Sequence, residues 1–97
     1  MPKRKSRKPT GLHALIGKKV VLDTAGPLTY LGTLREIHGD GFLLSDADIR
    51  DRNEGHVSKE EYICEARRSG IQANRKSVFV LAHAVLSASP LNEVVKG

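Results

Sequence analysis

Residues 28–47 constrain the fold more than any other stretch, because their pattern is typical of two strands joined by a tight turn. In the first run, LTYLGTLREIH at 28–38, apolar residues and one glycine recur at about every second position. Gly-Asp-Gly at 39–41 supplies a turn, and FLLSDA at 42–47 returns as the second strand. A glycine within a strand marks a strong bend or a close approach of another backbone, so Gly32 predicts a sharply curved hairpin. Such curvature is how a small sheet closes into a barrel.

Three further strands are predicted around this hairpin. KKVVLDT at 18–24 is β-branched at its centre and is broken by Ala-Gly-Pro at 25–27. The most continuous apolar run, SVFVLAHAVLSAS at 77–89, is long for one strand, and its small central residues 82–84 favour a bend between two short ones. Apolar residues at helical spacing in 11–16 predict a short helix or turn over one end of the core. Five short, bent, antiparallel strands indicate a small barrel, either SH3-like or OB-like.

A helix is expected between the third and fourth strands. DIRDRNEGHV at 48–57 is polar and resembles a loop, whereas SKEEYICEARRSG at 58–70 has helix signals at both ends. Ser58 and Glu61 have the spacing of a capping box, in which each residue satisfies a free backbone N–H near the helix start. A narrow apolar stripe, sufficient to dock one face of this helix, comprises Tyr62, Ile63 and Ala66.

The net charge of +5 is concentrated in one tail, MPKRKSRKPTG at residues 1–11. Removing the five basic residues of this tail leaves eleven basic residues against eleven acidic ones, so the rest of the chain is formally neutral. A segment with so little apolar content is expected to be disordered and extended. This tail would serve as an arm that binds phosphates, as a nuclear import signal in a eukaryotic cell, or only as a solubilising terminus. The five residues are Lys3, Arg4, Lys5, Arg7 and Lys8.

Neither a metal site nor a cofactor is expected. Cys64 is the only cysteine, which rules out an intramolecular disulfide, and the four histidines are scattered without ligand spacing. The carboxylates of Asp46, Asp48 and Asp51 are interleaved with arginines, which favours a solvated loop of local ion pairs over a cation site. The interleaved arginines are Arg50 and Arg52.

An enzymatic function is not expected either. Ser58 is better explained as a helix cap than as a nucleophile, and no phosphate loop or dinucleotide fingerprint is present.

No apolar run approaches the length that crosses a bilayer, so we expect an intracellular protein without a membrane partner. Its place would be the cytoplasm in a prokaryote, and either the cytoplasm or the nucleus in a eukaryote.

The order of elements and several motifs resemble the Sm-like (LSm) family. YLGTLREI resembles the aromatic-x-Gly-x-Leu signature of the family's second strand, with Tyr30, Gly32, Leu34 and Ile37 at core positions. FLLSDA resembles the third strand, and FVLAHAVLSAS is similar to the second Sm motif. The resemblance implies a mainly β fold: a strongly bent, five-stranded antiparallel Sm-like (SH3-like) barrel after a short N-terminal helix. The barrel would span 12–89, with a variable-loop insertion at 50–75 that carries a helix at 59–68, and tails at 1–11 and 90–97.

Two departures from the family pattern concern RNA binding. Members that bind uridine-rich RNA carry an Asp and an Asn in the loop after the second strand, and Arg-Gly or Lys-Gly in the second motif. Here the first loop reads HGDGF at 38–42, and Leu81-Ala82 stand in place of Arg-Gly. The side chains of Leu81 and Ala82 supply neither charge nor hydrogen bonds to a base edge. We therefore expect the uridine pocket to be absent. The loop residues that remain candidates for a ligand are His38, Asp40, Phe42 and His83.

RNA binding would then rest on electrostatic contacts of low sequence specificity. The first contact surface is the arm, and a second group of four cations flanks the end of the inserted helix and the start of the fourth strand. Aromatic residues are few and most are expected in the core, so stacking on bases would contribute little. The second group comprises Arg67, Arg68, Arg75 and Lys76.

An oligomeric scaffold for protein partners is the alternative function. Sm-like barrels typically form rings by pairing the fourth strand of one subunit with the fifth of the next, and 77–89 provides suitable edges. We therefore expect a homo-oligomeric ring, and the inserted helix is the candidate surface for a protein partner. The competing interpretation is that the apolar residues of this run, Val78, Val80, Val85 and Leu86, only fill the barrel.

Overall fold

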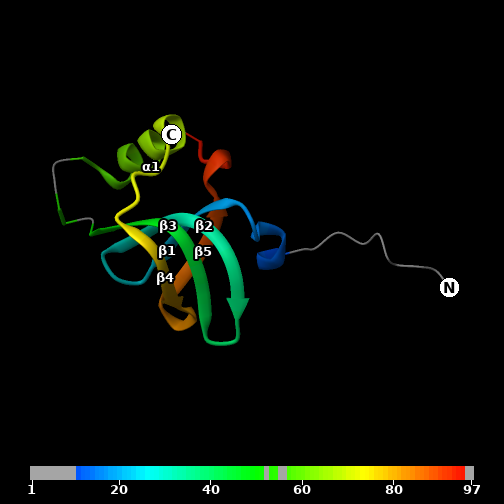
Figure 1. Cartoon of the computed structure of the whole chain (residues 1–97). Coiled ribbons are helices and arrows are strands. Elements are labelled where there is room, and N and C mark those ends of the chain that lie inside the picture. The colour runs from blue at the N-terminus through cyan, green and yellow to red at the C-terminus, as the bar shows by residue number, and fades with distance from the viewer. Residues whose placement is uncertain (1–10, 52, 55–56, 96–97) are drawn as a thin grey trace.

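A computed structural model describes residues 11–51, 53–54 and 57–95. Its five strands form one antiparallel sheet in the order β4-β3-β2-β1-β5, which bends around an apolar interior (Figure 1). The arm residues Lys3, Arg4, Lys5, Arg7 and Lys8, as well as Arg52, lie outside the described residues. In chain order the elements are the short 3-10 helix η1 (Gly11–Leu15), β1 (Lys19–Thr24), β2 (Leu28–His38), β3 (Gly41–Asp51), α1 (Lys59–Ser69), β4 (Arg75–Leu81), η2 (Ala82–Ala84), β5 (Val85–Pro90) and η3 (Leu91–Glu93).

The predicted element order is confirmed, and the main correction concerns the length of β3. The loop expected from residue 48 is wrong, because β3 continues to Asp51 and pairs there with the start of β2, with Leu28 opposite Asp51. The alternation of apolar and polar residues is weak at 48–51 for a physical reason. Its outer face meets polar groups of α1 instead of an apolar layer, as with Tyr62 and Asp48.

The curvature predicted at Gly32 is confirmed. A Cβ atom added there would lie 3.1 Å from the Cβ of Ala47, which is tighter than an ordinary van der Waals contact, so β2 and β3 approach closely at this point. The pairing of β2 with β3 changes register at this point, between Leu31 and Thr33, and again between Leu34 and Glu36. Such bulges increase strand twist and bend, which lets two long strands wrap around a small core.

One face of every strand contributes to the interior of the barrel. In β1 the alternate residues Val20 and Leu22 face this interior, whereas Val21 between them faces a second buried layer on the other side of the sheet. The cluster in this interior comprises Val20, Leu22, Leu34, Phe42, Leu44, Ala47 and Val80.

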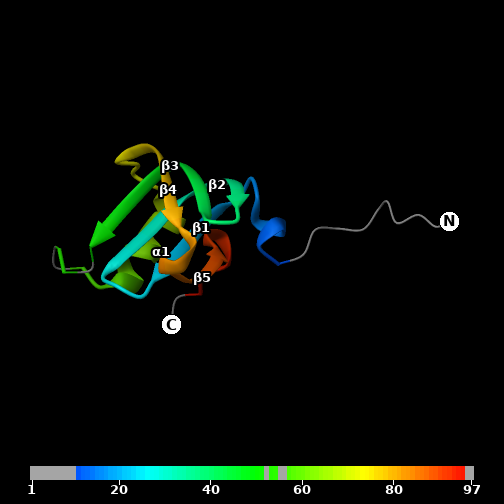
Figure 2. The same ribbon diagram turned by 90° about the horizontal axis from the view of Figure 1, so that it is seen from below.

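The opposite face of the sheet carries a second buried layer under α1. The capping box predicted at Ser58 and Glu61 is present, and α1 lies across the sheet beside η3 (Figures 1 and 2). Leu91 is only 3 % exposed, so the segment expected as a partly ordered C-terminal tail is packed at this position. Its side chain closes the layer between α1 and β1, which a helix with a narrow apolar stripe needs. The layer comprises Val21, Leu31, Ile63, Ala66 and Leu91.

Gly41 is required at the start of β3, which yields a first prediction. A Cβ atom at this position would lie 2.6 Å from the Phe79 ring and closer still to the carbonyl oxygen of Val80. We expect Gly41→Ala to destabilise the fold by about 1–3 kcal/mol, because backbone and ring would both have to move. Denaturant unfolding measures this difference. Gly39→Ala is the control, since its Cβ would meet nothing within 4 Å, and an equal loss of stability in both variants would contradict the prediction.

Candidate functional site

The structure brings the two loop regions of the candidate site together at one end of the barrel. The Ala82 N–H donates a hydrogen bond of 2.9 Å to the carbonyl oxygen of Asp40, and Gly41 pairs with Leu81 across β3 and β4. The β2–β3 turn and η2 therefore lie side by side, and the exposed His83 of η2 belongs to this end of the molecule.

The predicted loop residues differ in their access to a ligand. His38 is exposed, and its Nε2 lies 2.8 Å from Glu36 Oε1, while its ring centroid is 5.8 Å from that of Phe79. Phe42 is only 7 % exposed and packs inside the barrel, so it has little access to a ligand. Its position directly after the turn makes it the first inward residue of β3, opposite Val80.

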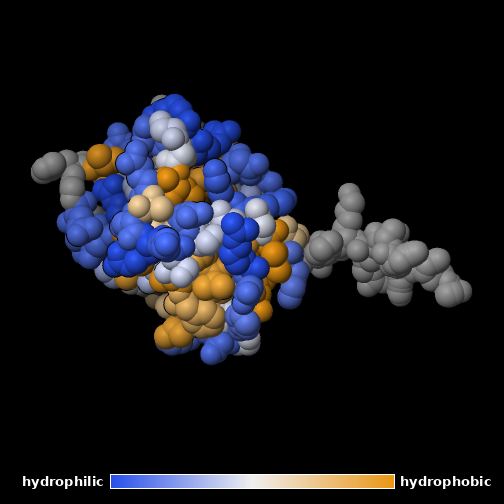
Figure 3. Space-filling view, viewed as in Figure 1, coloured by the Kyte–Doolittle hydropathy of each residue, from blue (hydrophilic) through white to orange (hydrophobic). Residues whose placement is uncertain are grey.

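An apolar patch lies on β4, next to these loops. Val80 points into the barrel, whereas its neighbours Phe79 and Leu81 are 40 % and 48 % exposed. Figure 3 shows apolar atoms gathered where β4 and η2 lie, in contrast to the hydrophilic surface of α1. The sequence contained a signal for this patch. A strand with one buried face needs apolar residues only at alternate positions, and VFVL has four in succession.

The fifth strand also exposes an apolar side chain. Leu86 is 71 % exposed, so the interpretation that it fills the barrel is wrong, while Val80 and Val85 do pack on the interior. Among the described residues, β4 pairs only with β3 and β5 only with β1. Both outer strands of the sheet therefore leave one row of backbone hydrogen-bonding groups without a strand partner in the described chain.

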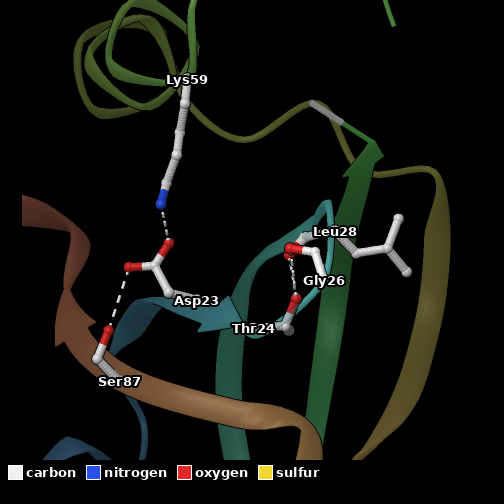
Figure 4. A network of polar contacts seen from close by, with 6 residues as sticks. All are labelled: Asp23, Thr24, Gly26, Leu28, Lys59 and Ser87. Atoms are coloured by element: carbon white, nitrogen blue, oxygen red, sulfur yellow. Dashed lines mark hydrogen bonds and ion pairs between the residues drawn. The ribbon is translucent and has the colours of Figure 1, made fainter. Parts of the chain in front are cut away.

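Polar contacts fix the first turn of α1 to the ends of β1 and β5 (Figure 4). Lys59 Nζ lies 2.5 Å from Asp23 Oδ1, a buried atom whose partner in the described structure is this ammonium group. The Ser87 hydroxyl donates to the other oxygen of Asp23, at 3.2 Å. Thr24 Oγ1 donates to the carbonyl oxygen of Leu28 at 2.6 Å and so closes the β1–β2 turn.

A second junction ties the same helix to β3. The Tyr62 hydroxyl donates to Asp48 Oδ2 at 2.6 Å, and the Arg50 guanidinium carbon lies 4.6 Å from the centre of the Tyr62 ring. Burial and the neighbouring Asp48 carboxylate both raise the pKa of the Tyr62 phenol, so this hydroxyl stays a donor throughout the neutral range. The expected loop of ion pairs is wrong for Arg50, which donates to the carbonyl oxygens of Glu54 and Val57 instead. Asp48 and Arg50 are thus engaged in holding α1 and the segment before it against β3.

The second group of cations is exposed at two places. Arg67 and Arg68 lie in the last turn of α1, and Arg75 and Lys76 begin β4. Arg68 forms an ion pair with Glu65, and the pKa of Glu65 is lowered by hydrogen bonds from Ser69 and from Arg68. One of the four cations is thus partly compensated. A shared phosphate track for all four remains a prediction.

Other kinds of site find no support within the described part of the chain. Those residues hold no group of three or more side chains that could bind a metal ion. None of the described helices is long and apolar enough to span a membrane.

Comparison with solved structures identifies the architecture. The Sm protein of Pyrococcus abyssii, solved in complex with a uridine heptamer, matches with a TM-score of 0.56 at 16 % identity, over 80 % of this chain and 89 % of that one. The chain has the Sm-like fold. At this identity the likeness concerns the fold and does not transfer the ligand. No family model matches the sequence, and no curated protein does.

Two further solved structures with a similar chain are of the NatC complex. In the complex bound to Gag peptide and CoA, the matching chain has a TM-score of 0.52 at 14 % identity, covering 80 % of this Sm-like chain and 87 % of that one. In the complex bound to CoA alone, the TM-score is 0.56 at 14 % identity, with 92 % and 100 % covered. Chains of this shape are thus found both with RNA and within a protein complex.

Proposed function

We propose that this Sm-like protein is a non-enzymatic assembly module that forms a homo-oligomeric ring and binds RNA mainly through electrostatic contacts. The proposal rests on the two outer strands of the sheet, β4 and β5, each of which has one unpaired edge among the described residues. β4 exposes Phe79 and Leu81, and β5 exposes Leu86, beside backbone groups without a strand partner among the described residues. Pairing β4 of one copy with β5 of the next would cover both edges, and the apolar side chains would add to the strand pairing.

The proposed mode of RNA binding follows from the side chains at the end of the barrel that carries the β2–β3 turn and η2, where the cation of the second motif is missing. Phe42 is buried, and Leu81 and Ala82 occupy the positions where family members place a cation and a glycine. A base at this end would find His38, Asp40 and His83, but no cation of the second motif. Affinity would therefore come from cations that contact phosphates, and it would depend steeply on salt. These cations are the arm residues Lys3, Arg4, Lys5, Arg7 and Lys8, together with Arg67, Arg68, Arg75 and Lys76.

Deletion of residues 2–9 tests the role of the arm. We expect weaker binding of single-stranded RNA, and a slope of log affinity against log salt that falls by about 0.7 for each phosphate that the arm no longer neutralises. Fluorescence anisotropy with oligo-uridine and oligo-adenosine at several salt concentrations gives both quantities. The affinity should fall by a similar factor for both sequences, because the arm contacts phosphates. Unchanged affinity and slope would show that the arm does not bind RNA.

A protein-binding scaffold is the second candidate, and the occurrence of similar chains within the NatC complex favours it. The partner would contact the inserted helix, whose outer surface is exposed at Glu60, Glu65 and Arg68. Affinity purification with and without nuclease separates the two functions. Partners that survive nuclease treatment support the scaffold, and partners that disappear support RNA binding.

A further inference from the structure

A hollow beside the first residue of β1 carries cations, which the end of the barrel with the β2–β3 turn and η2 lacks. Its volume is about 260 Å³, and it is lined by Lys18, Lys19 and Asn92. Lys19 is the first residue of β1 and Lys18 precedes it, while Asn92 comes from η3, near the other end of the sequence. Neither lysine forms an ion pair with any residue that the structure describes, and both side chains are exposed. Two free ammonium groups and a carboxamide are donors suited to phosphate oxygens.

The backbone around the hollow is well fixed. The Leu34 N–H donates to the carbonyl oxygen of Lys18 at 3.0 Å, and the Gly17 N–H donates to the carbonyl oxygen of Leu34 at 2.7 Å. On the other side, Leu91 is buried between β1 and α1 and anchors Asn92, the next residue. The backbone on both sides of the hollow is therefore anchored, which limits the conformational entropy that the backbone would lose when a phosphate binds.

The helix α1 lies near the element that carries Asn92. It contacts η3, and Ala66 packs in the same buried layer as Leu91. Arg67 and Arg68 lie in the last turn of this helix. In both Figure 1 and Figure 2, η3 lies between α1 and η1, which is the first described element after the arm.

We infer that Lys18, Lys19 and Asn92 form a phosphate-binding subsite for single-stranded RNA. The inference rests on the RNA-binding function proposed above and adds three residues to it.

The acidic neighbour of the subsite is Glu93, which follows Asn92 in η3 and does not line the hollow. A carboxylate so close in sequence to the subsite should repel RNA phosphates. Its removal is therefore expected to strengthen binding, whereas the loss of either lysine weakens it. Opposite signs from neighbouring substitutions would not arise from a general loss of folding.

The test compares Lys18→Gln, Lys19→Gln and their double variant in the full chain by salt titration with oligo-uridine and oligo-adenosine. We expect the double variant to bind both RNAs on the order of fivefold more weakly, with a salt slope reduced by roughly 0.7 for each phosphate that is no longer neutralised. Lys59→Gln is the matched control, because it removes one equal charge at the opposite end of α1. Glu93→Gln is expected to tighten binding.

Three outcomes separate this inference from the function on which it rests. Absence of RNA binding by the unaltered protein at low salt would overturn the proposed function and the subsite together. Binding by the unaltered protein with the same affinity and slope in the double variant would overturn the subsite alone. An equal weakening of binding in each single lysine variant and in Lys59→Gln would also overturn it, because a general effect of net charge would then explain the data.

Discussion

Leu31→Ala is expected to lower the free energy of unfolding by about 2–5 kcal/mol, although Leu31 lies outside the barrel interior. The residue is fully buried, at 0 % exposure, in the layer between the sheet and α1. The substitution leaves a cavity beside Ile63 and Ala66, because helix and sheet relax only partly around a missing side chain. For a domain of this size, the midpoint of thermal unfolding would fall by on the order of 10 °C or more.

Leu12→Ala is the matched control for this experiment. It makes the same chemical change on η1, where the side chain is partly exposed, and should cost well under half as much stability. Both variants are compared by denaturant unfolding at one protein concentration, because assembly would also contribute to stability. An equal loss of stability in the two variants would mean that α1 is not part of the core.

Leu86→Glu is expected to have the largest effect on assembly and little effect on the fold. In the single chain this side chain is largely exposed, so a carboxylate there remains in water. If β5 pairs with β4 of a second copy, the charge comes to lie beside Phe79 or Leu81 in an apolar contact. Burying an unpaired charge costs several kcal/mol, and each 1.4 kcal/mol weakens association about tenfold. Assembly should therefore be lost at micromolar concentration.

Val57→Glu is the matched control for the edge, since Val57 is an exposed apolar residue outside every described strand. Sedimentation or light scattering gives the mass of both variants, and circular dichroism shows whether they fold. A folded Leu86→Glu variant with the same assembly as Val57→Glu would contradict pairing through β5.

Much of the barrel could be predicted because its strands carry strong local signals. The bounds of β2 agree with the alternating run, and Gly32 and the bend at 82–84 have the predicted roles. The capping box likewise determined where α1 begins, since Ser58 and Glu61 satisfy each other's backbone donors. These features depend on residues close together in sequence, so the sequence alone reveals them.

The remainder depends on contacts between distant segments. The apolar stripe of α1 indicated that the helix docks, but not that Leu31 and Leu91 complete its layer. The end of β3 was missed because its polar residues pair with the first residues of β2. The proximity of Lys18 to Asn92 also follows only from the tertiary fold, because β1 and η3 are separated by most of the chain.

The native mass of the unaltered protein tests the central proposal most directly. The chain has a mass of 10.6 kDa, and exposed edges on β4 and β5 predict a closed homo-oligomer. Native mass spectrometry after nuclease treatment should give a single integral multiple of the chain mass, which persists without RNA. A mass of one chain at micromolar concentration, with the fold intact, would contradict the proposed assembly.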